Sequence, residues 1–170
     1  MQDILLRKIQ PGDNKFLASI VRETLEEFGA NRPGTVFFDD STDQLYELFQ
    51  QQGAVYYVVE KYGEILGGAG IFPSSGLAPG VCELSKMYLK KIARGLGLGK
   101  KLIETCLEFA SQNGYSSVYL ETMPELKKAV TLYQRFGFKF LKGPMGNTGH
   151  YGCDIWMQKK FKAPIAGALN

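Results

Sequence analysis

Apolar residues follow two different spacings along this chain, and the two spacings predict different elements. Short runs of mostly apolar residues predict strands at 4–9, 54–60, 64–72, 81–89, 116–121, 138–142 and 153–161. Stretches with apolar residues three and four positions apart predict helices near 13–28, 41–49, 98–112 and 122–136. The order of these elements predicts an α/β fold.

Three of the four predicted helices have a recognisable start signal. Asp13 is a candidate N-cap for the first helix. Ser41 and Gln44 have the spacing of a capping box for the second, and the same spacing recurs at Thr122 and Glu125 before the fourth. The third helix has the clearest apolar stripe, which consists of Leu98, Leu102, Ile103, Cys106, Leu107 and Ala110.

The composition indicates one ordinary globular domain. The 170 residues are 45% hydrophobic and 22% charged, and no linker or repeat interrupts the predicted domain at 1–162. Residues 163–170 are expected to form a C-terminal tail. The net charge of +3 does not indicate a nucleic-acid partner. Because no run of about 18 apolar residues occurs, no membrane partner is expected.

Cysteine and histidine usage limits the chemistry further. The three cysteines are scattered and form no Cys-x-x-Cys pair, which argues against a disulfide framework or a zinc site. With an N-terminus that lacks the pattern of a secretion signal, they fit a reducing, cytoplasmic location. The single histidine, His150, excludes a His-rich cluster, so no metal is expected.

The stretch RGLGLG at 94–99 places three glycines at every second position. Glycine is costly to order, so closely spaced glycines indicate either a place where the main chain closely approaches another group or a flexible turn. A P-loop needs glycine at position 94 and a hydroxyl at 101, where this chain has Arg94 and Lys101. A dinucleotide fingerprint fits poorly, because Lys100 replaces its third glycine.

Positive charge around the glycines favours a third interpretation. A helix begins in this window, and its first amides have no partners within the helix. Free N–H groups, the positive helix end and nearby cations predict a diphosphate site on the main chain, whereas the alternative is a solvated basic face. The six basic residues of the window are Lys86, Lys90, Lys91, Arg94, Lys100 and Lys101.

The segment CELSKMYLKKIARGLGLGKKLIETCLEFA resembles the acetyl-coenzyme A (acetyl-CoA) signature of the GNAT superfamily of N-acetyltransferases, through Arg94, Gly97 and Gly99. A second block, AVTLYQRFGF at 129–138, matches the family's Ala-x-x-Leu-Tyr-x-x-x-Gly-Phe. The separation of the blocks and the order of elements over about 3–161 also match. Leu126 departs from the pattern, because many members carry asparagine there, and the contact of that asparagine is not carried over.

The resemblance implies a mostly antiparallel sheet of six to seven strands, splayed at the cofactor site and flanked by about four helices. It also implies acetyl-CoA as co-substrate, with its pantetheine arm paired to the main chain around Met87, Tyr88 and Leu89. A homodimer is compatible with it, since dimers are common among members. The diphosphate is expected at Arg94, Gly95, Gly97, Gly99 and Lys100.

Transfer of an acyl group to an amine requires a base, because an alkyl amine with a pKa near 10.4 is almost fully protonated at neutral pH. Glu83 is the candidate, since a carboxylate within a largely apolar strand is unusual unless it is paired or used. A glutamate at the corresponding position acts as base in several family members. Alternatively, Glu83 pairs with a lysine or only binds substrate. Strand alternation predicts a shared face of Glu83, Ser85, Met87 and Leu89.

Tyr133 occupies the family position of the acid that protonates the departing thiolate. It also falls on an apolar helix stripe, so the alternative is a packing role with a satisfied hydroxyl. A covalent route through cysteine is not favoured, because Cys106 lies on an apolar face and Cys82 points away from Glu83.

Segments 29–43 and 142–152 are expected to line the acceptor mouth. There Asp39 and Asp40 are candidates to attract a cation, and His150 or Tyr151 to contact substrate or act as an alternative base. The sequence leaves an amino acid, a polyamine, an aminoglycoside and a protein N-terminus open as acceptors. The leading hypothesis is an acetyl-CoA-dependent N-acetyltransferase that acts on a primary amine of a small molecule or peptide by direct attack. The alternative is a silent acyl-CoA-binding sensor or regulatory module.

Overall fold

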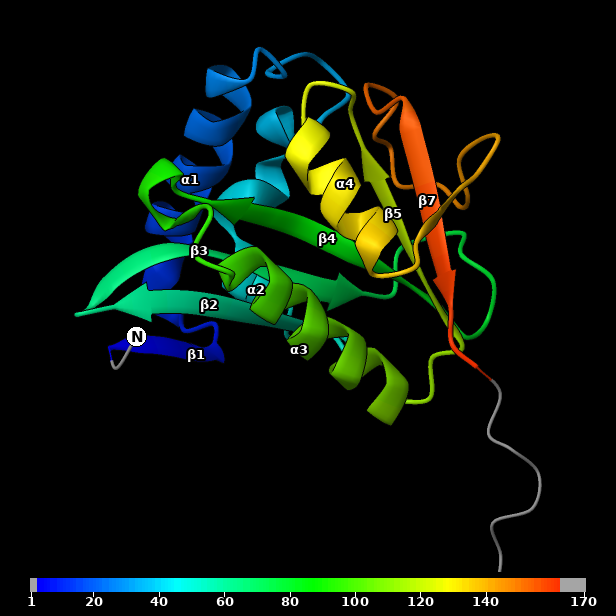
Figure 1. Ribbon diagram of the computed structural model, residues 1–170, viewed down its shortest axis with the longest axis horizontal. Coiled ribbons are helices and arrows are strands. Elements are labelled where there is room, and N and C mark those ends of the chain that lie inside the picture. The colour runs from blue at the N-terminus through cyan, green and yellow to red at the C-terminus, as the bar shows by residue number, and fades with distance from the viewer. Residues whose placement is uncertain (1–2, 163–170) are drawn as a thin grey trace, which may run out of the picture.

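Seven strands form one sheet in the computed structural model, which describes residues 3–162 (Figure 1). Their order is β1-β2-β3-β4-β5-β7-β6, and β4 and β5 form a parallel pair while the other neighbours are antiparallel. The expected mostly antiparallel sheet is therefore confirmed. The strands are β1 Ile4–Lys8, β2 Val55–Lys61, β3 Glu64–Phe72, β4 Val81–Leu89, β5 Ser117–Thr122, β6 Lys139–Phe140 and β7 Ile155–Lys160.

Helices cover both faces of the sheet. In Figure 1, α3 and α4 lie in front of the strands and α1 lies behind them. The described residues contain four α-helices, as expected: α1 Asn14–Glu27, α2 Leu45–Leu48, α3 Leu98–Gln112 and α4 Lys127–Arg135. The predicted tail at 163–170 lies outside the described residues. Within 3–162, no helix combines the length and apolar character needed to cross a membrane.

Each face of the sheet has its own apolar core. All six residues of the predicted stripe on α3 are buried and pack with Ile71, Cys82 and Leu120 from the strands. On the opposite face, Leu17 and Ile20 of α1 pack with strand residues of β2. The 3.6-residue spacing therefore predicted the buried side of α3 correctly.

The predicted cap at Asp13 has another partner. Asp13 directly precedes α1, but its side chain makes no capping hydrogen bond to that helix. Its carboxylate instead accepts hydrogen bonds from Arg7 and from the main chain of Gln10, each at 2.7 Å. Asp13 therefore ties β1 to the start of α1 through a partly buried ion pair.

The two predicted capping boxes are wrong. Residues 40–43, which include Ser41, form a 3-10 turn, so α2 begins only after Gln44 and spans one turn. Thr122 ends β5 instead of capping α4, which begins at Lys127, and Glu125 forms an ion pair with Arg32. Tertiary partners and strand pairing, which local spacing does not contain, replace both boxes.

A β-bulge interrupts β4 at its centre. Ser85 and Tyr88 pair with glycines only two residues apart on β3, so Lys86 and Met87 together lie opposite Ala69. Lys86 has a φ of 52°, in the left-handed region that residues with a side chain rarely adopt. The bulge therefore shifts the side-chain alternation by one residue.

This shift overturns the predicted shared face of β4. Met87 and Leu89 pack against the α3 core, on the same side as Cys82 and Leu84. Glu83 lies on the other side, so it does not share a face with Met87 and Leu89. Strict alternation predicted the reverse, because one inserted residue exchanges the two faces of a strand.

Beyond Glu83, β4 and β5 separate. Their parallel pairing has only three residue pairs and ends at Glu83 with Tyr119, although β4 continues to Leu89 and β5 to Thr122. Figure 1 shows the two strands running apart, with α4 beside the gap. The sheet is therefore splayed at this point, as expected.

Tyr56→Phe tests what holds the bulge. The Tyr56 hydroxyl donates a 2.8 Å hydrogen bond to the Lys86 carbonyl, and both groups are buried. Its removal leaves a buried carbonyl without this donor, so the free energy of unfolding should fall by about 1–3 kcal/mol in urea denaturation. Tyr57→Phe is the matched control, since no bond of the Tyr57 hydroxyl is seen among the described residues. Equal losses in the two variants would contradict the assignment.

Candidate active site

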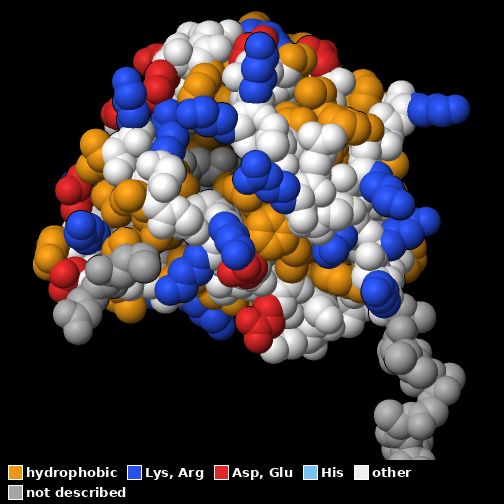
Figure 2. Space-filling view, in the orientation of Figure 1, with side chains coloured by type: hydrophobic (Ala, Val, Ile, Leu, Met, Phe, Trp, Pro, Cys, Tyr) orange, Lys and Arg blue, Asp and Glu red, His pale blue; other side chains and the backbone are white. Residues whose placement is uncertain are grey.

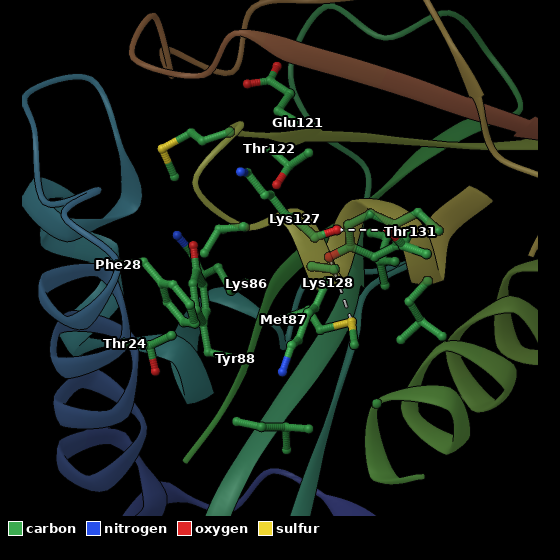
Figure 3. Close-up of a pocket in the computed structure, with 18 of the residues that line it drawn as sticks. Thr24, Phe28, Lys86, Met87, Tyr88, Glu121, Thr122, Lys127, Lys128 and Thr131 are labelled. Atoms are coloured by element: carbon green, nitrogen blue, oxygen red, sulfur yellow. Dashed lines mark hydrogen bonds between the residues drawn. The ribbon is translucent and has the colours of Figure 1, made fainter. Parts of the chain in front are cut away.

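A cavity of about 690 Å³ lies where β4 and β5 separate. Figure 2 shows a hollow on this side of the molecule with Lys and Arg side chains around it. Thr24 of α1 and Phe28, which directly follows α1, line it, and Thr131 lines it from α4 (Figure 3). All ten residues proposed from the sequence for catalysis or cofactor binding line it: Glu83, Met87, Tyr88, Leu89, Arg94, Gly95, Gly97, Gly99, Lys100 and Tyr133.

The glycine turn leads directly into α3. Gly95 and Gly97 have φ values of 77° and 78°, a left-handed conformation in which any other residue is strained. Gly99 lies in the first helical turn, where an added Cβ would come within 3.3 Å of Leu132 and Met87. The start of α3, with its amides unpaired within the helix, therefore borders the cavity, and this arrangement suits an anion.

Arg94 holds the turn in place. Its guanidinium binds both carboxylate oxygens of Glu27 on α1, at 3.0 and 2.9 Å, and donates to the Leu89 carbonyl at 2.9 Å. It also lies over the ring of Phe28, 5.1 Å from the centroid. Arg94 thereby links α1 to the end of β4, and much of its donor capacity is already used.

The predicted patch of six basic residues is divided in the structure. Lys90 pairs with Glu64 at 2.8 Å, and the Lys86 side chain is buried against Asp39. Lys100 is exposed beside the glycine turn. The helix α4 adds further cations to the cavity wall, which sequence reasoning missed. Their only signal in the sequence was their position on the polar face of that helix. They are Lys127, Lys128 and Arg135.

Tyr133 packs in the core and also lines the cavity. Its ring is buried and packs edge-on against Phe138, with centroids 5.9 Å apart. Its hydroxyl approaches the sulfur of Met87 at 3.8 Å, the contact dashed in Figure 3. Burial raises the pKa of the phenol, so the hydroxyl keeps its proton at neutral pH.

Glu83 is a buried carboxylate on the cavity wall, with 6% of its surface exposed. Burial raises the pKa of Glu83, and the nearby carboxylate of Glu121 raises it further. The hydroxyl of Ser74, which donates to Glu83 Oε2, and the charges of His150 and Lys86 oppose that rise. A carboxylate with a raised pKa binds a proton more readily near neutral pH, as a general base must.

Four further residues form a charged network beside Glu83. Asp39 Oδ2 lies 2.7 Å from His150 Nε2 and 3.3 Å from Lys86 Nζ. His150 Nδ1 lies 3.8 Å from Glu121 Oε2. The sequence suggested Asp39 and His150 as acceptor-mouth residues, and the structure brings the two side chains into contact.

Sequence reasoning missed Ser74 and Glu121. Glu121 lies two residues beyond Tyr119, the partner of Glu83 in the parallel pair, so strand register is the signal that would have found it. Ser74 had no such signal, since a loop after β3 brings it to Glu83.

The cysteines do not have the environment of nucleophiles. Burial raises the pKa of Cys82 and of Cys153 to about 12, and it raises the pKa of Cys106 as well. Cys153 lines the cavity, while Cys106 belongs to the α3 core. Because the thiolate is the reactive form, these environments disfavour a covalent route.

Comparison with known proteins identifies the class to which this fold and site belong. The sequence profile of the acetyltransferase (GNAT) family matches residues 17–138. The uncharacterized N-acetyltransferase YjgM of Escherichia coli K12 is 38% identical over 160 residues, which cover 94% of this chain and 96% of YjgM. The uncharacterized N-acetyltransferase C1271.07c of Schizosaccharomyces pombe is 32% identical over 76% of this chain and 78% of its own.

Solved structures share the fold. An acetyltransferase of the GNAT family from Staphylococcus aureus Mu50 has a TM-score of 0.79 at 17% identity, over 94% of this chain and 99% of its own. The acetyltransferase yncA of Salmonella typhimurium, solved with its cofactor acetyl-CoA, has a TM-score of 0.72 at 19% identity, over 96% and 99%. The protein is thus an acyltransferase with an acetyl-CoA-binding fold. It belongs to the GNAT family of N-acetyltransferases.

His150→Gln tests the ion pair with Asp39 through its pH dependence. Burial would lower the pKa of His150, but the hydrogen bond and charge of Asp39 raise it above its ordinary 6.5. Burial would likewise raise the pKa of Asp39, but His150 and Lys86 lower it below its ordinary 3.8. The pair therefore stabilises the fold fully between about pH 4 and 6.5, and this contribution is lost as pH rises through the raised pKa of His150.

In urea denaturation, the wild type should exceed His150→Gln in free energy of unfolding by more at about pH 5.5 than at about pH 9. A difference that is the same at both pH values, or larger at the higher one, would contradict the ion pair.

Proposed function

We propose that this protein transfers the acetyl group of acetyl-CoA to a primary amine of a small molecule or peptide by direct attack, within a single domain at 1–162. The observation that carries the proposal is one cavity bordered by a helix start with unpaired amides, an open strand edge and two buried titratable groups, Glu83 and Tyr133. No one segment of the chain supplies all of these parts.

The co-substrate would bind along the splayed strand. Main-chain amides at Gly95, Gly97 and Gly99, with Lys100, would hold its diphosphate, and Arg94 would keep the turn in position. The pantetheine arm would lie where β5 leaves β4, beside Met87, Tyr88 and Leu89, and pair with main-chain groups like an added strand. This placement brings the thioester toward Glu83 and Tyr133.

The chemistry follows from the two buried groups. About one alkyl amine in 2,500 is unprotonated at pH 7, so Glu83 would take a proton from the ammonium, directly or through water. The amine lone pair then attacks the thioester carbonyl carbon. The C–N bond forms, the C–S bond breaks, and Tyr133 would donate its proton to the departing sulfur. The nitrogen would lose its second proton as the amide forms, and that proton would restore the Tyr133 hydroxyl. The products are an acetylated amine and coenzyme A.

A sensor that binds acyl-CoA without turnover is the second candidate function. The glycine turn and the open edge of β4 would serve it equally well. It has no use for a buried carboxylate of raised pKa facing the same cavity as a protonated phenol, which favours the enzyme.

Glu83→Gln separates the two functions. Loss of the base should lower kcat about 10²- to 10⁴-fold while acetyl-CoA affinity stays unchanged. Thiol release with a panel of primary amines measures the first quantity, and calorimetric titration measures the second. Glu108→Gln, on the exposed face of α3, is the control and should leave both unchanged. Tight acetyl-CoA binding with no amine acetylated by the wild type would favour the sensor.

Gly97→Ala tests the diphosphate site, with Gly114→Ala as its matched control. Both glycines have left-handed φ values, 78° and 81°, and nothing lies within 4 Å of an added Cβ at either. Each variant should lose roughly 1–2 kcal/mol of stability from backbone strain. We expect only Gly97→Ala to weaken acetyl-CoA binding, by about tenfold in Kd, or about 1.4 kcal/mol. Equal acetyl-CoA affinities of Gly97→Ala and Gly114→Ala in calorimetry would contradict a diphosphate site at this turn.

A further inference from the structure

We propose that the acceptor carries a carboxylate beside its amine, as an amino acid does, and that Lys86 binds this carboxylate. The inference rests on the proposed function and names the substrate class of the same site. It is carried by the position of a buried lysine, three residues from Glu83 on one cavity wall, whose hydrogen-bond donors are not all used within residues 3–162.

The fold brings Lys86 to this place by an unusual backbone. The left-handed φ of 52° at the bulge sets the direction of its side chain, which is 4% exposed and lines the cavity (Figure 3). A left-handed conformation at a residue other than glycine is strained, and such strain is concentrated at functional sites. The carbonyl of Lys86 is held by Tyr56, so the bulge is anchored from the opposite side.

The ammonium of Lys86 is incompletely paired among the described residues. It has three N–H donors, and its partner there is Asp39, at the long distance of 3.3 Å. Asp39 is shared with His150, which lies closer at 2.7 Å. Burial lowers the pKa of Lys86, which reflects the cost of a buried charge with few acceptors. A carboxylate on the substrate would supply the missing acceptors.

The charges on this wall complement a zwitterion. Glu83 offers a carboxylate to an ammonium group, and Lys86 offers an ammonium to a carboxylate. A polyamine or aminoglycoside has no carboxylate to offer Lys86, and the amine of a protein N-terminus has a peptide group in place of the carboxylate. Phe28, Val36 and Met123 also line the cavity, so an apolar side chain suits the rest of the acceptor.

The first test compares three acceptors with the wild type: phenylalanine, phenylalaninamide and phenethylamine. We expect kcat/KM for phenylalanine to exceed each of the other two by roughly tenfold or more, since they lack the carboxylate. Equal values for the three acceptors would overturn the inference and leave the proposed function intact. Acetylation of none of them, nor of any other amine, would overturn the proposed function and this inference with it.

Lys86→Met then tests the residue itself. It should lower kcat/KM for phenylalanine roughly 10- to 100-fold, the effect of one charge-assisted hydrogen bond, and change the value for phenethylamine by less than about threefold. Lys86→Arg, which keeps the charge, should recover part of the loss. Lys90→Met is the control, because Lys90 follows β4 but pairs with Glu64 at the surface. Lys90→Met should leave kcat/KM unchanged for both acceptors.

Equal losses for the two acceptors in Lys86→Met would overturn the assignment of Lys86. If Lys86→Met does not fold, as judged by its thermal melt, the role of Lys86 is tested by Lys86→Arg together with the comparison of the three acceptors in the wild type. In that case, a Lys86→Arg variant that folds and loses activity equally toward both acceptors would overturn it.

Discussion

The separation of β4 from β5 is the constraint on which the rest of this structure depends. Parallel pairing ends at Glu83, while β3 continues to pair with β4 as far as Leu89. The far end of β4 is therefore held from one side and open on the other. Main-chain polar groups require partners, and an extended ligand with amide groups is a suitable partner for such an edge.

The two ends of the cavity have different electrostatic characters. At the end of the glycine turn, main-chain amides and exposed cations suit a solvated diphosphate. At the other end, the buried side chains of Glu83 and Lys86 and the half-buried Asp39 act on one another at short range. The first arrangement suits binding through the backbone. The second suits proton transfer and the recognition of a small charged acceptor, because burial strengthens each interaction.

Elements that depend on local pattern were predictable. The spacing of apolar residues identified the strands and the buried side of α3, because packing against one sheet face imposes a period on the sequence. The glycine turn, Glu83 and Tyr133 were found for a similar reason, since their neighbours along the chain mark them. The prediction of a capping box at Thr122 and Glu125 was wrong, because Glu125 pairs with Arg32, which is distant in sequence, and Thr122 pairs within the sheet.

The sequence by itself determined the class of fold, the family and the residues expected at the co-substrate site, because each is written in short-range spacing. Only the tertiary structure decided which side of β4 each residue faces, since a bulge of one residue exchanges the faces and leaves no mark in the apolar pattern. It alone also brought Ser74, Asp39 and His150 to the neighbourhood of Glu83. These residues come from separate segments, and contacts between distant segments depend on strand order and register, which local periodicity does not specify.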